Sequence, residues 1–373
     1  MREPHYRLFP FLALLATVAS AQSPPSQVPG AMLYIGTLSK NVLVLDEAQE
    51  KVVDKIPLHG TPRGLSLSYD KKKIYVNTWQ DGIEVVDLAS RKVVNHFVLD
   101  EANRKVRVKG FAPDPQDRVL YAVTAAVVKQ VDRFEIEKPK FAVIDLAQQK
   151  MTKTVGYPKE EESPFGLFAG YRVSPDGKFL YVFRENVLIF DTADFKLVEK
   201  IDLSKPQPLY PGMATINLGG GDDPNEDPGI LTQVFNASDP VVHNRIFGIA
   251  QVDLAKRTFD FTPVGPAATG MLELRLSPDR KIGYTVAFFG QHGTRRTELW
   301  VFDMAARKLV KRVEFPGRTR FNFAVSGNGR ALYVYGAGPT VEIYDAATLQ
   351  LQKVINLNAD ATTGMLVLRP RAS

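Results

Sequence analysis

Short runs of β-branched and aromatic residues recur along the chain, and each run ends in an aspartate followed by a polar turn. Such runs, bounded by turn residues, are typical of strands. They recur roughly every 40 to 60 residues, a period that indicates a repeat architecture. The aspartates that end the seven runs are Asp46, Asp87, Asp145, Asp191, Asp253, Asp303 and Asp345.

A second phrase precedes most of these runs and resembles Ser174-Pro175-Asp176-Gly177. Proline sets the φ angle of a turn and glycine accepts a positive φ, so the phrase predicts a tight turn between antiparallel strands. In the clearest repeat we expect strands at 64–68, 73–78, 82–88 and 92–99. Four short antiparallel strands per repeat are typical of a propeller blade. The sequence therefore predicts an all-β, seven-bladed β-propeller.

The two ends of the chain predict how the ring closes. The first repeat offers only three strands, at 32–36, 42–45 and 52–57, while Thr363–Leu368 near the C-terminus is a spare strand. We expect the spare strand to complete the first blade, because closure removes exposed sheet edges.

The first residues have the pattern of an export signal. Arg2 and Arg7 give the segment a positively charged start, and an apolar run follows at 8–19. Ala19-Ser20-Ala21 is a small-residue cleavage motif. The domains expected are a signal peptide at 1–21, a flexible linker at 22–30 and the propeller at 31–373. A periplasmic or extracellular location follows, without stable membrane insertion. The alternative is that the segment is not cleaved and is retained as a membrane anchor.

Cysteine is absent from the 373 residues. This excludes disulfides, thiolate metal sites, c-type haem attachment and a cysteine nucleophile within this chain. The formal charge of +6 comes from scattered lysines and arginines rather than from a basic stripe with aromatics. Nucleic-acid binding is therefore not expected, whereas an acidic protein partner stays open.

Predicted loop lengths distinguish the two faces of the ring. Turns between strands one and two, and between three and four, are short. Between strands two and three we expect long connections at 125–140, 218–244 and 289–297. Function concentrates on irregular loops held by a rigid scaffold, so this second face is the predicted binding face; neutral insertions are the alternative.

No catalytic or metal-binding motif is present, and we predict neither a catalytic residue nor a metal site. The histidines in the long connections either converge over the channel or lie apart on the surface. The arginines either grip a carboxylate or form ion pairs between blades, and the tryptophan either anchors a partner or packs at the rim. The acidic stretch 222–227 is either a calcium-binding or a solvated loop. The binding-face candidates are His59, Arg63, Trp79, His243, His292, Arg295, Arg318 and Arg320.

Several segments carry a family resemblance. Lys73–Thr78 with Ile83–Asp87 resembles the repeats of YVTN-type propellers. Phe134–Pro139, followed by Ala142–Asp145, resembles the third blade of the β subunit of quinohemoprotein amine dehydrogenase. Ile343–Leu349 resembles the closing blade of that subunit.

This resemblance implies a periplasmic, non-catalytic scaffold subunit of an amine dehydrogenase. It implies protein partners: a small subunit carrying cysteine tryptophylquinone and a dihaem cytochrome c. No cofactor is expected in this chain. Two other functions stay open, a stand-alone exported YVTN-repeat binding or surface protein and a propeller lactonase.

Overall fold

The computed structural model describes residues 30–369, apart from 80–81, 162–169, 185, 206–213, 219–222, 239–240, 242–243 and 316–320. The predicted signal peptide at 1–21 and nearly all of the linker lie outside the described residues. Within the described part of the chain, none of the helices has the length and apolar character needed to span a membrane.

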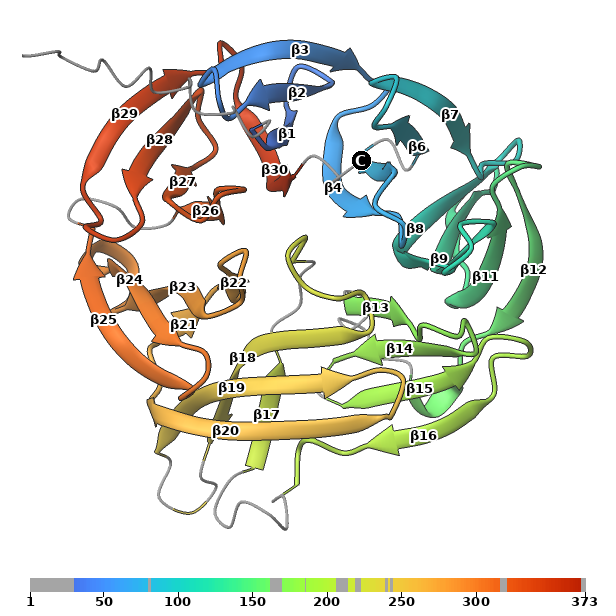
Figure 1. The fold of residues 1–373 in the computed structure, drawn as a ribbon. Coiled ribbons are helices and arrows are strands. Elements are labelled where there is room, and N and C mark those ends of the chain that lie inside the picture. Colours follow the sequence, from blue (N-terminus) through green and yellow to red (C-terminus); the bar gives the residue numbers. More distant parts are fainter. Residues whose placement is uncertain are drawn as a thin grey trace, which may run out of the picture.

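Seven antiparallel sheets form a ring around a central channel, which confirms the predicted seven-bladed propeller (Figure 1). The blades, each from its innermost to its outermost strand, have the following bounds. Blade one comprises β30 (Ala361–Leu368), β1 (Met32–Thr37), β2 (Asn41–Asp46) and β3 (Lys51–Pro57). Blade two comprises β4 (Pro62–Leu67), β5 (Lys73–Thr78), β6 (Gly82–Asp87) and β7 (Lys92–Val98). Blade three comprises β8 (Arg104–Pro113), β9 (Val119–Lys129), β11 (Lys140–Asp145) and β12 (Lys150–Gly156), with β10 (Phe134–Ile136) added beside β9.

The other four blades follow the same order. Blade four comprises β13 (Gly170–Val173), β14 (Phe179–Phe183), β15 (Val187–Asp191) and β16 (Leu197–Ile201). Blade five comprises β17 (Ala214–Leu218), β18 (Ile230–Ser238), β19 (Arg245–Asp253) and β20 (Thr258–Pro266). Blade six comprises β21 (Gly270–Met271) and β22 (Arg275–Leu276), then β23 (Ile282–Phe289), β24 (Arg296–Asp303) and β25 (Lys308–Glu314). Blade seven comprises β26 (Asn322–Val325), β27 (Ala331–Tyr335), β28 (Thr340–Asp345) and β29 (Leu351–Asn356). Two short 3-10 helices lie in other blades: η1 (Lys159–Glu161) follows β12, and η2 (His292–Thr294) lies between β23 and β24.

The recurring aspartate ends the third strand of every blade. Its carboxylate accepts hydrogen bonds from the backbone of the following turn, as Asp46 does from Ala48 N at 2.8 Å and Asp345 does from Thr348 N at 2.7 Å. Four residues after each aspartate the backbone takes a left-handed φ, for example 53° at Arg91. Aspartate favours turns because its side chain bonds to the backbone ahead of it. The repeat visible in the sequence is therefore this turn.

Tyrosines on the second strands tie neighbouring blades together. Tyr181 on β14 donates its hydroxyl to Leu254 O, in the aspartate turn of blade five, at 2.7 Å. Tyr333 on β27 likewise donates to Glu47 Oε1, in the aspartate turn of blade one, at 3.1 Å. A buried tyrosine needs such a partner for its hydroxyl. Each of these side chains thus packs between blades and bonds across the same interface.

The ring closes through β30, as the sequence predicts. β30 runs antiparallel to β1, with Leu368 opposite Met32 and Met365 opposite Ile35. Glu47 reinforces this junction because its carboxylate accepts hydrogen bonds from Ala31 N and Gly327 N, both at 2.9 Å. Blade one is thereby bonded to blade seven.

Two of the predicted long loops are wrong. The segment 218–244 contains the strand β18, so its acidic part lies between strands one and two, on the face opposite the one predicted. Thr232, Gln233 and Asn236 interrupt the apolar pattern of β18 and conceal the strand. The segment 125–140 is largely strand as well, since β9 continues to Lys129 and pairs with β10.

We expect Leu366→Ala to lower the free energy of unfolding by about 2–5 kcal/mol, because Leu366 is 5% exposed on the closing strand and its loss leaves a cavity. Leu351→Ala on β29 is the matched control. Leu351 is 50% exposed, so the change should cost about 0.5 kcal/mol or less. Guanidinium denaturation of both variants measures the difference, and equal losses would contradict the role of β30.

Candidate functional site

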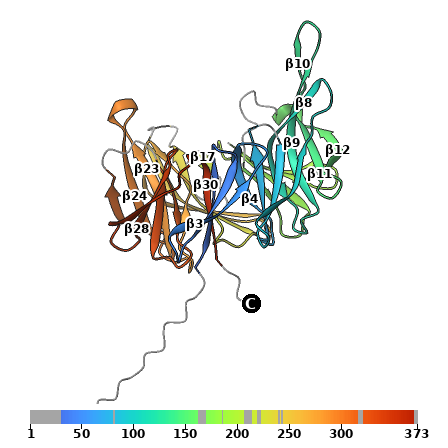
Figure 2. The same ribbon diagram turned by 90° about the horizontal axis from the view of Figure 1, so that it is seen from above.

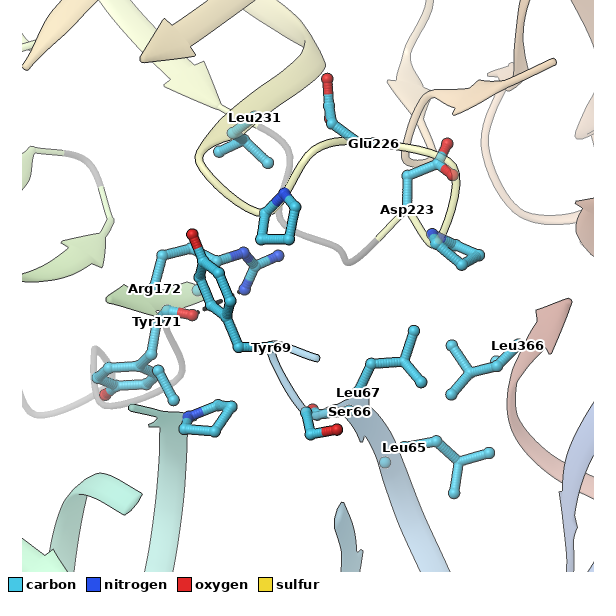
Figure 3. Close-up of a pocket in the computed structure, with 18 of the residues that line it drawn as sticks. Leu65, Ser66, Leu67, Tyr69, Tyr171, Arg172, Asp223, Glu226, Leu231 and Leu366 are labelled. Carbon is cyan, nitrogen blue, oxygen red and sulfur yellow. Dashed lines mark hydrogen bonds between the residues drawn. The ribbon is translucent and has the colours of Figure 1, made fainter. Parts of the chain in front are cut away.

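A cavity of about 420 Å³ occupies the central channel. Leu65 and Leu67 of β4 and Leu366 of β30 give it an aliphatic side, whereas Tyr69, Arg172 and Glu226 give it a polar side (Figure 3). Clefts and cavities of this size with a few polar groups are typical of small-molecule sites. The channel is therefore one place where this protein can bind a ligand.

The segment 223–229, which we call the acidic turn, lies between β17 and β18, and its residues Asp223, Pro224, Glu226, Asp227 and Pro228 line this cavity. Asp223 accepts a hydrogen bond from Leu276 N of blade six at 2.6 Å. Asp227 forms a bidentate pair with Arg280, both contacts 2.6 Å long. Lys71 of blade two donates to Pro224 O at 2.7 Å. Each described carboxylate of the predicted acidic stretch 222–227 thus accepts hydrogen bonds from the protein itself. These bonds join blades five and six. Calcium binding by this stretch remains a hypothesis.

Burial governs the ionisation of this turn. Burial raises the pKa of Glu226 to about 7, against opposing hydrogen bonds from Thr232. Burial likewise raises the pKa of Asp223 and lowers that of Lys71. Perturbed pKa values often mark functional sites. Burial therefore brings the pKa of a carboxyl in the wall of the cavity close to neutral pH.

A second gathering of polar side chains lies at the rim of blade two. The Arg63 guanidinium lies over the Trp79 ring, 5.3 Å from its centroid. Trp79 N donates to Thr61 O at 2.9 Å, in the same connection that carries His59. The structure thus brings together three of the predicted binding-face residues, His59, Arg63 and Trp79.

The rim also contains two residues that the sequence did not indicate, Glu84 and His96. His59 Nδ1 lies 3.1 Å from Glu84 Oε2, and the His59 and His96 rings stack with centroids 3.8 Å apart. His96 lies directly opposite Glu84 in the pairing of β7 with β6. The sequence did contain one indication of this site, because Glu84 is a lone carboxylate in the apolar run Ile83–Val86. We name His59, Glu84 and His96 the blade-two cluster.

Arg295 is the one remaining candidate whose side chain the structure describes. Arg295 lies over the Phe288 ring of its own blade, 5.5 Å from the centroid. His243, Arg318 and Arg320 lie outside the described residues, and only the backbone of His292 is described, in η2. Convergence of these residues over the channel remains a prediction.

A ribbon from blade three projects beyond the ring (Figure 2). It consists of 104–107 of β8, 125–129 of β9 and β10, and we call it the arm. Arg104 and Glu137 pair across the arm, from β8 to the residue after β10, with Arg104 Nε 2.6 Å from Glu137 Oε1. Hydrogen bonds from Arg104 and then Lys140 lower the pKa of Glu137 to about 2. Near the tip, Val131 is fully exposed, Phe134 69% exposed and Ile136 78% exposed.

No protein-family model matches the chain, and no curated protein matches it either. Its fold is similar to that of NirN, a dihydro-heme d1 dehydrogenase solved in complex with DHE. That match has a TM-score of 0.53 and 14% identity and covers 94% of this chain and 78% of that one. A putative 6-phosphogluconolactonase from Bacteroides fragilis matches with a TM-score of 0.53, 14% identity and coverage of 93% and 100%. Hydrazine synthase of Kuenenia stuttgartiensis matches with a TM-score of 0.50, 14% identity and coverage of 91% and 99%. At these identities the similarity establishes the propeller fold alone.

The stability of the protein should fall between pH 4.5 and pH 7 because of Glu226. Its pKa is about 7 in the folded chain and near the ordinary 4.5 in the unfolded chain, so in this window only the folded state keeps the proton. Unfolding therefore releases a proton, and the contribution of about 3 kcal/mol present below pH 4.5 is lost as the pH rises through 7.

Denaturation curves across this pH range, compared with those of Glu226→Gln, isolate the effect. The glutamine variant should lack this fall, whereas Glu135→Gln, at an exposed position of β10, should follow the wild type. Parallel curves for the wild type and Glu226→Gln would contradict the assignment.

Proposed function

We propose that this chain is a non-catalytic scaffold that binds another protein through the arm of blade three. The observation that carries the proposal is the group of exposed apolar side chains on the arm, Val131, Phe134 and Ile136. Alternate residues of a strand share a face, so Phe134 and Ile136 lie on one side of β10. The Arg104–Glu137 pair links β8 to the segment after β10 and so limits the ordering cost of binding.

Exposed apolar groups on a sheet edge favour association. Burial of a phenylalanine or isoleucine side chain is worth about 1.5–3 kcal/mol. β10 pairs with β9 on one side and ends its sheet on the other, which leaves backbone groups for a further strand. A partner that covers Phe134 and Ile136 would therefore gain both apolar contact and backbone hydrogen bonds.

The partner that we propose is a redox subunit of an exported amine dehydrogenase. The support is the resemblance of Phe134–Pro139 to the β subunit of quinohemoprotein amine dehydrogenase, since this segment forms one edge of the arm. In such a complex a chain without cysteine leaves the quinone cross-link and the c-type haem attachments to its partners. The names of NirN and hydrazine synthase agree with a redox setting for a propeller of this shape. The leader motif supports a periplasmic or extracellular site of assembly.

A stand-alone binding protein is the second candidate, and the channel cavity of about 420 Å³ favours it. In that case the ligand is a small molecule in the channel, and the arm has no protein partner. The two functions differ in what accompanies the chain when it is isolated from its source.

We expect the wild-type chain, purified from its native source, to bring a quinone- or haem-bearing subunit with it. The double variant Phe134→Ser/Ile136→Ser should bind that subunit at least ~100-fold more weakly, because it removes about 3 kcal/mol or more of apolar burial. Val310→Ser/Val354→Ser is the matched control, since both valines are exposed on outer strands of other blades. Affinity measured by surface plasmon resonance distinguishes the variants.

Recovery of a colourless monomer without a redox partner would contradict the subunit proposal and favour the stand-alone protein. Hydrolysis of a sugar lactone by the purified chain would instead place it with the propeller lactonases. Equal affinity of the arm variant and the wild type would move the docking surface away from the arm.

A further inference from the structure

The blade-two cluster has the composition of a metal site. His59, Glu84 and His96 each offer one ligand atom, and these atoms all lie within 4.8 Å of one another. Two imidazoles with one carboxylate are a recurrent ligand set for zinc that leaves a coordination position open. We propose that these three residues bind a divalent transition-metal ion of the zinc type at the rim of blade two.

The backbone places two of the ligands in register. Glu84 of β6 and His96 of β7 face each other across the antiparallel pair, so their side chains lie on the same side of the sheet. His59 comes from the connection between β3 and β4. The site is therefore assembled from three segments of the chain, two of them strands of a rigid sheet.

Glu84 is held in one orientation. Its carboxylate, with a fully buried side chain, accepts hydrogen bonds from Gly60 N at 2.9 Å and from His59 N at 2.9 and 3.0 Å. A metal ligand gains affinity when such hydrogen bonds fix its position. Oε1 accepts the bonds from Gly60 N and His59 N, whereas Oε2 takes only the longer contact from His59 N besides the His59 imidazole, so Oε2 is the oxygen placed to bind an ion.

The charge of Glu84 also favours a cation. In the described part of the chain, the groups that contact its carboxylate are two backbone N–H groups and the His59 imidazole. A buried carboxylate is costly unless a positive charge compensates it. A divalent ion beside the two imidazoles would supply that charge.

The imidazoles are accessible and close together. Their rings lie 3° from parallel with centroids 3.8 Å apart, and the His59 side chain is 62% exposed. Zinc–nitrogen bonds are ~2.0–2.1 Å long and lie in the plane of the ring, so the exposed His59 ring must turn out of its stack with His96 for both rings to bind one ion. Water would complete the coordination.

The test is a calorimetric titration of the chelator-treated full chain with Zn²⁺. We expect one ion per chain, and a rise in the thermal midpoint with Zn²⁺ because the ion binds only the folded state. His59→Ala and His96→Ala should each abolish the specific binding, and Glu84→Gln should weaken it by about 10- to 100-fold. Glu160→Gln, at an exposed position of the 3-10 helix η1, is the control for Glu84→Gln and should bind like the wild type.

Retention of full affinity in the double variant His59→Ala/His96→Ala would overturn the proposal. So would the absence of saturable binding by the wild type, which would leave the stacked histidines as a packing contact that Glu84 supports. Circular dichroism of each variant establishes that it is folded, and the exposed His59→Ala keeps the test valid if the buried Glu84→Gln does not fold. Neither the arm nor its partner enters this test, so its outcome is separate from that of the proposed function.

Discussion

The pairing of β30 with β1 is the constraint on which the rest of the molecule depends. Six blades are built from consecutive strands, so each can form from a local stretch of chain, whereas blade one joins residues from the two ends. Without that pairing the ring has two free edges and the channel has a gap in its wall. The bonds of Glu47 to Ala31 and Gly327 extend the closure from one sheet to the interface between blades one and seven.

A closed ring gives its two faces different roles. On one face the acidic turn crosses between blades and is fixed by Leu276, Arg280 and Lys71. On the other face the arm and the blade-two cluster are supported from below by regular strands and are open above. The polar contacts of the acidic turn and the candidate binding groups of the arm and the blade-two cluster therefore lie on opposite faces of the ring.

The sequence predicted the features that depend on local chemistry. An aspartate that bonds to the next turn, with a left-handed residue four positions later, is the same in every blade, and it indicated the number of blades and where each third strand ends. Prediction failed where strand register decides a contact or where polar residues occupy a strand. Glu84 meets His96 through strand register, and linear spacing does not reveal this contact. Thr232 and Gln233 belong to a buried strand although their polarity is typical of a loop.

The antiparallel register of the closing pair has a mechanical consequence. Met32 and Leu368 lie opposite each other at the same end of the β1–β30 ladder, so both strands leave the ring from one face, away from the arm (Figure 2). A force that pulls the two chain ends apart would load this ladder in unzipping geometry. Its residue pairs would then separate one after another, whereas in shear geometry all its bonds would bear the load together. Tension between the two ends would therefore rupture the seam of blade one first.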